Sequence, residues 1–457
     1  MSLAPSLNGL LPCLEAAREQ TTPQRPQVLA SFSLASPKVD QLALFSANHQ
    51  HLPACLWHVQ AQGVFRLGLG QAHEFKGQHD ESWQTLEQRW QHMVAGAVIH
   101  GEHRPALFGG FAFDKGKPRT RLWHDFPDAA LTLPRFEWHE NQAHTHLVVN
   151  VLVDSSTDCA QLALAMSREW EGICARSLPV VEAAHRGHVR LSMPHLWKQD
   201  VSNAVSLIQR SRLKKVVLAR ARKVPVSEPL HVIMRRLLDK QPHAYLFAFA
   251  RNHSCFVGAS PECLLNVRDR CLHTMALAGS APRSQDTSSD EHLGAQLLAS
   301  EKDNAEHAMV VTSLSQCLAR HCTALQVAPR PRLHKLAHIQ HLLTPVQGVL
   351  GPDTHLLAVA ECLHPTPAVG GFPRQAALDY IRNCEQLDRG WYAGPVGWLN
   401  DKGDGEFAVA LRSALLEGGC ATLFAGCGLV ENSDPESEYR ESDLKMETMR
   451  EVLVTGS

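Results

Sequence analysis

The spacing of hydrophobic positions changes repeatedly along the chain between a period typical of strands and a period typical of helices. In the first 190 or so residues, short apolar runs bounded by polar or glycine-containing segments predict β-strands. Apolar residues three and four positions apart predict helices. The predicted strands are 41–47, 63–70, 104–114 and 144–154, and the predicted helices are 81–98 and 159–177.

From about residue 190 onward the predicted elements are longer and contain most of the charged residues that could do chemistry. A polar loop is expected near 281–292, directly before one of the longest predicted helices, and a proline-rich loop is expected at 327–335. The helices predicted in this part cover 195–212 and 292–321 and begin again at 437, and the strands cover 213–224, 394–400, 406–416 and 423–430.

The order of these elements predicts an α+β or mixed α/β fold that is rich in strands. Strands and helices do not follow each other in the regular βαβ order of a parallel sheet. No flexible linker separates the two halves of the chain, which favours one composite domain over two independent ones.

The composition is that of an ordinary soluble globular protein, with 457 residues, 44% hydrophobic residues and a net charge of −2. This charge gives no reason to expect nucleic acid or a membrane as a partner. No basic leader or run of ~20 apolar residues is found, so a cytoplasmic location is expected. The 13 cysteines are scattered without CxxC pairs, which predicts reduced cysteines packed as small hydrophobic residues.

A group of charged residues near the end of the chain suggests a metal site. Glu438, Glu441 and Lys445 are spaced i, i+3 and i+7, so a helix would present them on one face. Gly426 and Gly428 in the preceding strand would let its backbone approach a ligand closely. With Glu306 from another predicted helix, the carboxylates form a candidate Mg²⁺ site, although charged helix positions are more often simply solvated.

Three further residues combine a charge with apolar neighbours. Lys215 opens the strand 213–224, and its ammonium either extends to water or lies in a dry pocket that favours the neutral amine. Glu262 follows the turn in "FVGASPECL", where partial burial would keep its carboxyl protonated as a general acid. Arg412 is predicted on an apolar strand, and its guanidinium matches a carboxylate. Together these residues predict a pocket for a small dianion.

Several motifs in this half occur in an order that resembles the chorismate-utilising enzymes. They are "KVVLAR", "GASPE", "LAGSAPR", "ASEKDNAEH", "HPTPAVGGFP", "YAGPVGW" and "FAGCGLV" followed by "SEYRESDLK". Within that family the chain is most similar to the isochorismate synthases, of the menaquinone type. The resemblance implies a large single-domain sandwich of two packed β-sheets flanked by helices. Residues 1–190 would complete the sandwich, and residues 191–457 would form the chorismate-binding catalytic part.

The resemblance also implies a reaction, the Mg²⁺-dependent isomerisation of chorismate to isochorismate. Water attacks ring carbon 2 and the hydroxyl group leaves carbon 4. By motif, Lys215 would activate the water and Glu262 would protonate the departing hydroxyl. Glu306 and Glu441 would bind Mg²⁺, with Glu438 nearby or bound through water. The expected substrate-binding residues are Gly279, Ser280, His341, Ala368, Tyr392, Arg412, Gly426, Gly428 and Lys445, of which Arg412 and Tyr392 would take the enolpyruvyl carboxylate.

Differences from related enzymes favour water over ammonia as the nucleophile. Anthranilate synthases usually lack the lysine found here as Lys215 and carry threonine at the position of Ala368, and aminodeoxychorismate synthases show "PIKGT" where this chain has "ALAGS". No obligate glutaminase partner is therefore expected. Two alternatives stay open: a salicylate synthase, which would also eliminate pyruvate, and a chorismate-binding protein without turnover. The joint presence of the base, the acid and the metal carboxylates argues against the second.

Overall fold

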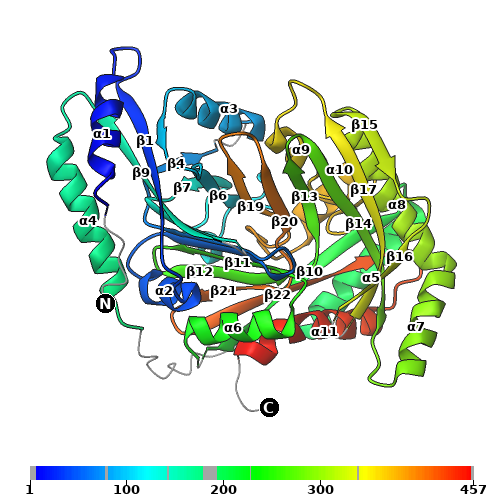
Figure 1. Ribbon diagram of the computed structural model, residues 1–457. Helices are drawn as coiled ribbons and strands as arrows, with labels where there is room; N and C mark the ends of the chain where they lie inside the picture. Colours follow the sequence, from blue (N-terminus) through cyan, green and yellow to red (C-terminus); the bar gives the residue numbers. More distant parts are fainter. Residues whose placement is uncertain are drawn as a thin grey trace.

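The computed structural model describes residues 7–77, 81–141, 144–178, 193–226, 228–336 and 339–453. Two large β-sheets pack together and helices cover their outer faces (Figure 1). Buried apolar side chains from both sheets, such as Phe256 and Phe407, belong to one continuous hydrophobic cluster. The predicted mixed α/β sandwich is confirmed.

The larger sheet has twelve strands within the described residues, and all of its ladders are antiparallel except the one between its last two strands. In order across the sheet these strands are β18 (Gly371–Phe372), β10 (Lys215–Pro225), β22 (Cys420–Leu429), β21 (Ser413–Glu417), β12 (Ser254–Ser260), β11 (Tyr245–Arg251), β2 (Ala54–Val59), β3 (Val64–Leu69), β8 (Phe136–Glu140), β9 (Thr145–Asp154), β1 (Gln27–Ala35) and β5 (Val98–His100).

The second sheet is antiparallel throughout its described ladders, and one short strand, β16 (Arg332–Lys335), pairs only with β17. The order of its other strands is β15 (Cys322–Val327), β17 (Ile339–Leu350), β14 (Cys271–Pro282), β13 (Cys263–Arg268), β20 (Gly405–Val409), β19 (Pro395–Asn400), β6 (Ala106–Phe111), β7 (Ala129–Leu133) and β4 (His73–Lys76).

Helices bury one apolar face against each sheet. On the outer face of the larger sheet, residues of α1, α4, α6 and α11 join a second hydrophobic cluster with its strands. In Figure 1, α6 and α11 lie below these strands, and α1 and α4 lie to the left, beside β1 and β9. On the other sheet, α8 packs against β14 and β17, and α9 packs against β13. None of the helices in the described part of the chain has the length and apolar character needed to cross a membrane. The helices are α1 (Leu10–Glu19), α2 (Gln41–Asn48), α3 (Trp83–Val94), α4 (Cys159–Ala175), α5 (Pro194–Arg210), α6 (Leu230–Lys240), α7 (Thr287–Ala299), α8 (Glu301–Leu318), α9 (Leu356–Leu363), α10 (Arg374–Cys384) and α11 (Pro435–Leu453).

Both sheets contain strands from the first and the second half of the chain. The ladder between β11 and β2 joins the halves in the larger sheet, and the ladder between β19 and β6 joins them in the other. The N-terminal strands therefore extend sheets that the C-terminal strands begin. The expected boundary between residues 190 and 191 lies outside the described residues, and the division into two parts stays a prediction.

Several of the predicted elements are wrong. Residues 41–47, predicted as a strand, form helix α2, because the Asp40 side chain caps it by accepting a hydrogen bond from Ala43 N at 3.1 Å. The predicted helix 292–321 is two helices, and α7 already begins inside the expected loop 281–292. Ser300 separates them with an extended backbone, and its hydroxyl caps α8 by accepting from Asp303 N.

The prediction that all cysteines are reduced is wrong for one pair. A disulfide joins Cys317 near the end of α8 to Cys362 near the end of α9, although 45 positions separate them in the sequence. The other eleven cysteines are free, as predicted. Spacing along the chain could not indicate this bond, because it depends on how two distant helices pack.

Candidate active site

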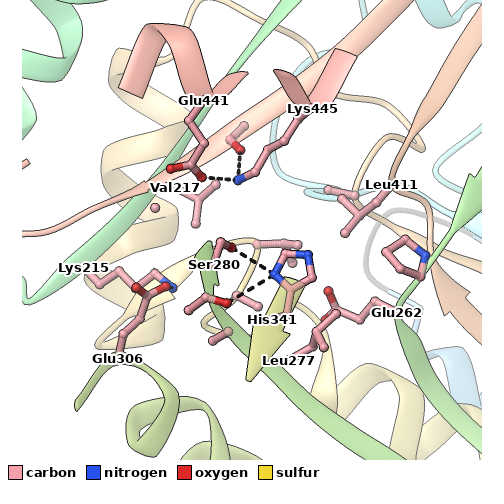
Figure 2. A pocket seen from close by; sticks show the side chains of 18 of the residues that line it. Lys215, Val217, Glu262, Leu277, Ser280, Glu306, His341, Leu411, Glu441 and Lys445 are labelled. Carbon is pink, nitrogen blue, oxygen red and sulfur yellow. Dashed lines mark hydrogen bonds and ion pairs between the residues drawn. The ribbon is translucent and has the colours of Figure 1, made fainter. Parts of the chain in front are cut away.

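One cavity of about 260 Å³ brings together all the residues that the sequence singled out (Figure 2). Strands from both sheets and helices α8 and α11 contribute to its wall. The residues expected from the sequence that line this cavity are Lys215, Glu262, Gly279, Ser280, Glu306, His341, Ala368, Tyr392, Arg412, Gly426, Gly428, Glu438, Glu441 and Lys445. Their positions agree with one binding site, and their individual roles stay predictions.

Two of the charged residues lie where the chain passes from one sheet to the other. Ser260 ends β12 in the larger sheet, and β13 in the other sheet begins after Glu262. In the same way Arg412 lies between β20 and β21, which belong to different sheets. Backbone hydrogen bonds hold the two crossings together, from Val409 N to Glu262 O at 3.0 Å and from Ala259 N to Arg412 O at 3.1 Å. The fold therefore fixes both side chains at one end of the cavity.

The position of Arg412 corrects the prediction that residues 406–416 form one strand with Arg412 on it. Arg412 has a left-handed backbone with φ of 48°, which ends one strand and turns the chain into the next. Such a conformation in a non-glycine residue costs roughly 1–3 kcal/mol and often marks a functional site. Burial lowers the pKa of Arg412, and its guanidinium has no ion pair within the described residues. An anionic ligand would satisfy this charge.

Lys215 reaches the cavity because a glycine in the neighbouring strand leaves room for it. Val217 of β10 pairs with Gly428 of β22, and Ala219 pairs with Gly426. A Cβ atom at Gly428 would lie 2.8 Å from Lys215 Cε, so only glycine lets the lysine side chain pass. Lys215 is 1% exposed, and its Nζ donates to Glu306 Oε1 at 2.6 Å. The lysine is therefore buried and paired with a carboxylate.

Glu262 is a buried carboxyl group in the cavity wall. It is 4% exposed, and none of the described residues forms a hydrogen bond or ion pair with its carboxyl oxygens. Burial raises its pKa to about 7, against the opposing effect of the charges of Lys215 and Arg412. In Figure 2, Lys215 lies on one side of the cavity and Glu262 on the other, with Ser280 and His341 between them. A group held between them could lose a proton on one side and gain one on the other.

The last helix delivers its charged face as the sequence predicts. Glu438, Glu441 and Lys445 of α11 all line the cavity. Lys445 Nζ contacts Glu441 Oε1 at 2.7 Å and donates to Gly426 O at 3.0 Å. The charge of Lys445 lowers the pKa of Glu441, whereas burial and the charge of Glu441 raise the pKa of Glu438. A cation near Glu438 would relieve this repulsion.

A group of possible ligand atoms supports a cation at this point. Single oxygens of Glu438 and Glu441 and the sulfur of Cys427 lie within 4.8 Å of one another. Cys427 is buried and its thiol donates to the Glu438 carbonyl oxygen, so the two carboxylates are the groups that face the cavity. These two carboxylates offer oxygen ligands of the kind that Mg²⁺ prefers, and Glu306 lines the same cavity without belonging to this close group.

His341 presents one free nitrogen toward the cavity. Its Nδ1 lies 3.2 Å from the Gly279 carbonyl oxygen and 2.9 Å from Ser280 Oγ (Figure 2). Because a carbonyl oxygen only accepts, Nδ1 carries the hydrogen and Nε2 is left as an acceptor. Nε2 is buried without a partner, and burial lowers the pKa of His341 to about 3, so the ring is neutral. The histidine can therefore accept a hydrogen bond from a ligand hydroxyl group.

The sequence reasoning missed two structural supports of the cavity. Arg389 lines it and forms a buried ion pair with Glu385 at 2.6 Å. Arg389 also donates to the carbonyl oxygens of Val217 and Val369, which are both cavity residues. The four-residue spacing of Glu385 and Arg389 would indicate an ion pair if both lay on a helix. Helix α10, however, ends at Cys384, before both residues. Lys302 and Asp303, also in the cavity wall, were missed because the predicted long helix concealed the start of α8.

Tyr392 completes the part of the wall near Arg412. Its ring stacks on Phe424 with centroids 5.1 Å apart. Burial raises the pKa of Tyr392 to about 12, so its hydroxyl is neutral and can donate a hydrogen bond. Ala368 and Val369, which precede β18, close the wall beside it.

Comparisons with known proteins agree with this site. A family model described as "Chorismate binding enzyme" matches residues 14–454. The salicylate biosynthesis isochorismate synthase of Pseudomonas aeruginosa is 39% identical over 99% of this chain and 95% of its own length. The isochorismate synthase MenF of Bacillus subtilis is 31% identical over 93% of both chains.

Solved structures extend the same similarity to the fold. The menaquinone-specific isochorismate synthase MenF of Escherichia coli matches with a TM-score of 0.78 and 26% identity, over 98% of this chain and 100% of that one. The anthranilate synthase component I of Streptococcus pneumoniae, at 22% identity, shares the fold with a TM-score of 0.69, over 84% of this chain and 92% of that one. On these matches, which span nearly the whole sequence, the chain belongs to the chorismate binding enzyme family.

Proposed function

We propose that this protein is an isochorismate synthase, an isomerase that converts chorismate to isochorismate with Mg²⁺. The observation that carries the proposal is that Lys215 and Glu262 face one cavity from opposite sides. The similarity to isochorismate synthases over nearly the full length supports it. The substrate is a dianion, which suits a cavity that contains the buried cation Arg412.

Lys215 is the proposed base that takes a proton from the attacking water. In the structure its ammonium is paired with Glu306. Glu306 would also hold the metal ion, which would free Lys215 Nζ to face the water. The amine would then accept a proton as the water oxygen bonds to ring carbon 2.

Glu262 is the proposed acid that completes the exchange. Hydroxide is a poor leaving group, so the oxygen on carbon 4 needs a proton as its bond breaks. A carboxyl group with a pKa near 7 is partly protonated at neutral pH and can give that proton. One water enters and one water leaves, so chorismate and isochorismate are isomers. The proton gained by Lys215 and lost by Glu262 is returned through solvent.

Glu306, Glu441 and Glu438 are the residues that would hold Mg²⁺. Bound there, the ion would supply positive charge for the carboxylate on the substrate ring. Arg412 and Tyr392 are assigned to the enolpyruvyl carboxylate, because Arg412 is a buried cation with no ion pair among the described residues and Tyr392 is a neutral donor. His341 and Lys445 would contact the substrate through their side chains. The other predicted substrate-binding residues would contact it through small side chains or backbone; they are Gly279, Ser280, Ala368, Gly426 and Gly428.

Product analysis separates this function from its nearest alternative. The protein would be incubated with chorismate and Mg²⁺, and the products separated by liquid chromatography. Isochorismate as the main product supports the proposal. Salicylate with pyruvate would instead identify a salicylate synthase, and chorismate binding without conversion would identify a silent binding protein.

The proposal includes the cellular setting. Water as the nucleophile requires no glutaminase subunit. Eleven free cysteines suit the reducing conditions of the cytoplasm. The relatives include proteins named for salicylate biosynthesis and for menaquinone, and either pathway would begin with the same isomerisation.

A further inference from the structure

The disulfide between Cys317 and Cys362 lies outside the cavity and plays no part in the proposed reaction. The two Cα atoms are 6.1 Å apart, which is within the range that a disulfide can bridge without moving the backbone. Cys317 is buried and Cys362 is half-buried, so a reagent could reach the pair from the Cys362 side. Disulfides in reducing compartments are usually transient and serve redox chemistry.

The surroundings of the two sulfurs suit thiol exchange. A ring nitrogen of His321 lies within 4.8 Å of both sulfurs. Burial and the charge of Arg320 lower the pKa of His321, so its imidazole is neutral and can accept a proton. Arg374 donates to the Cys362 carbonyl oxygen at 2.7 Å and so holds the backbone of this cysteine in place. The thiolate is the reactive form of a cysteine, and a neutral imidazole within reach can take the thiol proton.

We propose that Cys317 and Cys362 form a reversible thiol–disulfide couple, with His321 as the base that activates Cys362. The reaction partner is a small disulfide of the glutathione type. The Cys362 thiol gives its proton to His321, and its sulfur attacks the small disulfide, which releases one thiolate that takes up the proton. Cys317 then attacks the Cys362 sulfur and releases the second small thiol. Two protein thiols lose two electrons and two protons, and the small disulfide gains them.

The couple joins two elements that both lead to the active-site cavity. Helix α8 carries Lys302, Asp303 and Glu306 in its first two turns, and Cys317 lies near its other end. Helix α9 ends just after Cys362, and the following segment brings Ala368 and Val369 to the cavity. Oxidation therefore restrains both parts of the cavity wall, and reduction releases them.

The test is a redox titration of the purified full-length protein. The protein is equilibrated in mixtures of reduced and oxidised glutathione, acid-quenched, alkylated with N-ethylmaleimide and digested for mass spectrometry. The expected result is that Cys317 and Cys362 change together from alkylated to cross-linked, and back again with dithiothreitol. Cys384, which is exposed, and Cys322, which is half-buried, should not become part of any cross-link.

Variants show whether the surroundings matter. Cys362→Ser should abolish the cross-link, and the matched control Cys384→Ser should keep it. His321→Gln should slow formation of the cross-link several-fold at neutral pH without preventing it. Hydrogen exchange should be slower in the oxidised protein for amides of 301–318 and 356–370, and this difference should vanish in Cys362→Ser.

Three results would overturn the proposal. The two cysteines could stay fully alkylated in every mixture, or stay cross-linked in native protein under excess dithiothreitol. In the third result, both cysteines resist alkylation, no cross-linked peptide is found, and elemental analysis finds one Zn²⁺ per chain. The last result would make Cys317, His321 and Cys362 a metal site instead.

Discussion

Replacing Gly428 with alanine would put a methyl group in the path of the Lys215 side chain. A Cβ atom built there lies 2.8 Å from Lys215 Cε, 3.3 Å from Nζ and 3.6 Å from Glu306 Oε1. Packed carbon atoms keep roughly 3.5–4.0 Å apart. The lysine must therefore move by about 1 Å, because the new methyl group is fixed to the strand.

This displacement predicts a large loss of turnover with a small change in binding. A misplacement of about 1 Å in a catalytic group can cost about 100-fold in rate, or about 2.7 kcal/mol of activation free energy. We expect kcat for isochorismate formation to fall by about this factor, with chorismate affinity within about tenfold of wild type. The assay is steady-state product formation by chromatography, with binding measured by calorimetry.

Two glycine variants serve as controls. A Cβ at Gly172, on the exposed face of α4, meets nothing within 4 Å. Gly172→Ala should keep full activity and gain up to about 1 kcal/mol of stability. A Cβ at Gly426 would lie 3.2 Å from the nearest atom. The kcat of Gly426→Ala should therefore lie between those of Gly172→Ala and Gly428→Ala. A Gly428→Ala protein that folds and turns over like wild type would refute the claim that the placement of Lys215 limits the reaction.

Two further predictions concern the carboxyl groups. The pKa of Glu262 is raised from 4.5 to about 7, so stability falls as pH rises from about 4.5 to 7, because the unfolded chain releases this proton while the folded protein still holds it. The value of kcat/KM should fall above about pH 7, where the folded protein loses the acid form. Glu262→Gln should remove this fall along with most of the activity. In urea unfolding, its free energy of unfolding should exceed that of wild type by at most about 3 kcal/mol at pH 8 and by little at pH 4. Equal gains in this free energy at both pH values would contradict the burial of the ionised carboxyl group as the cause. Glu441→Gln should raise the Mg²⁺ concentration needed for half-maximal activity at least tenfold. The control variant Glu436→Gln, on the exposed first turn of α11, should leave this concentration unchanged. If Glu441→Gln also leaves it unchanged, Glu441 is not a metal ligand.

The sequence could predict those parts of the site that depend on local spacing. The face of α11 with Glu441 and Lys445 follows from helical periodicity alone, and the strand that carries Lys215 follows from its apolar run. The ordered motifs supplied which distant segments belong together. The sequence predicts that Gly428 lets the strand backbone approach a ligand closely. The structure shows instead that Gly428 makes room for the Lys215 side chain.

The parts that could not be predicted depend on contacts between distant segments. The run 406–416 reads as one strand, because hydrophobicity does not reveal that the chain leaves one sheet for the other at Arg412. The break at Ser300 is concealed because a single serine separates two helices that follow each other directly along the chain. The pair Cys317 and Cys362 and the support of Val217 by Arg389 exist only after α8, α9 and β10 have packed.

The most direct test of the central claim follows the oxygen of the attacking water. Wild-type protein and Lys215→Ala would be incubated with chorismate and Mg²⁺ in water enriched in oxygen-18, and isochorismate would be analysed by mass spectrometry. The account predicts solvent oxygen at ring carbon 2 of the wild-type product, and binding of chorismate without product for Lys215→Ala. Isochorismate without the label, or undiminished turnover by Lys215→Ala, would contradict it.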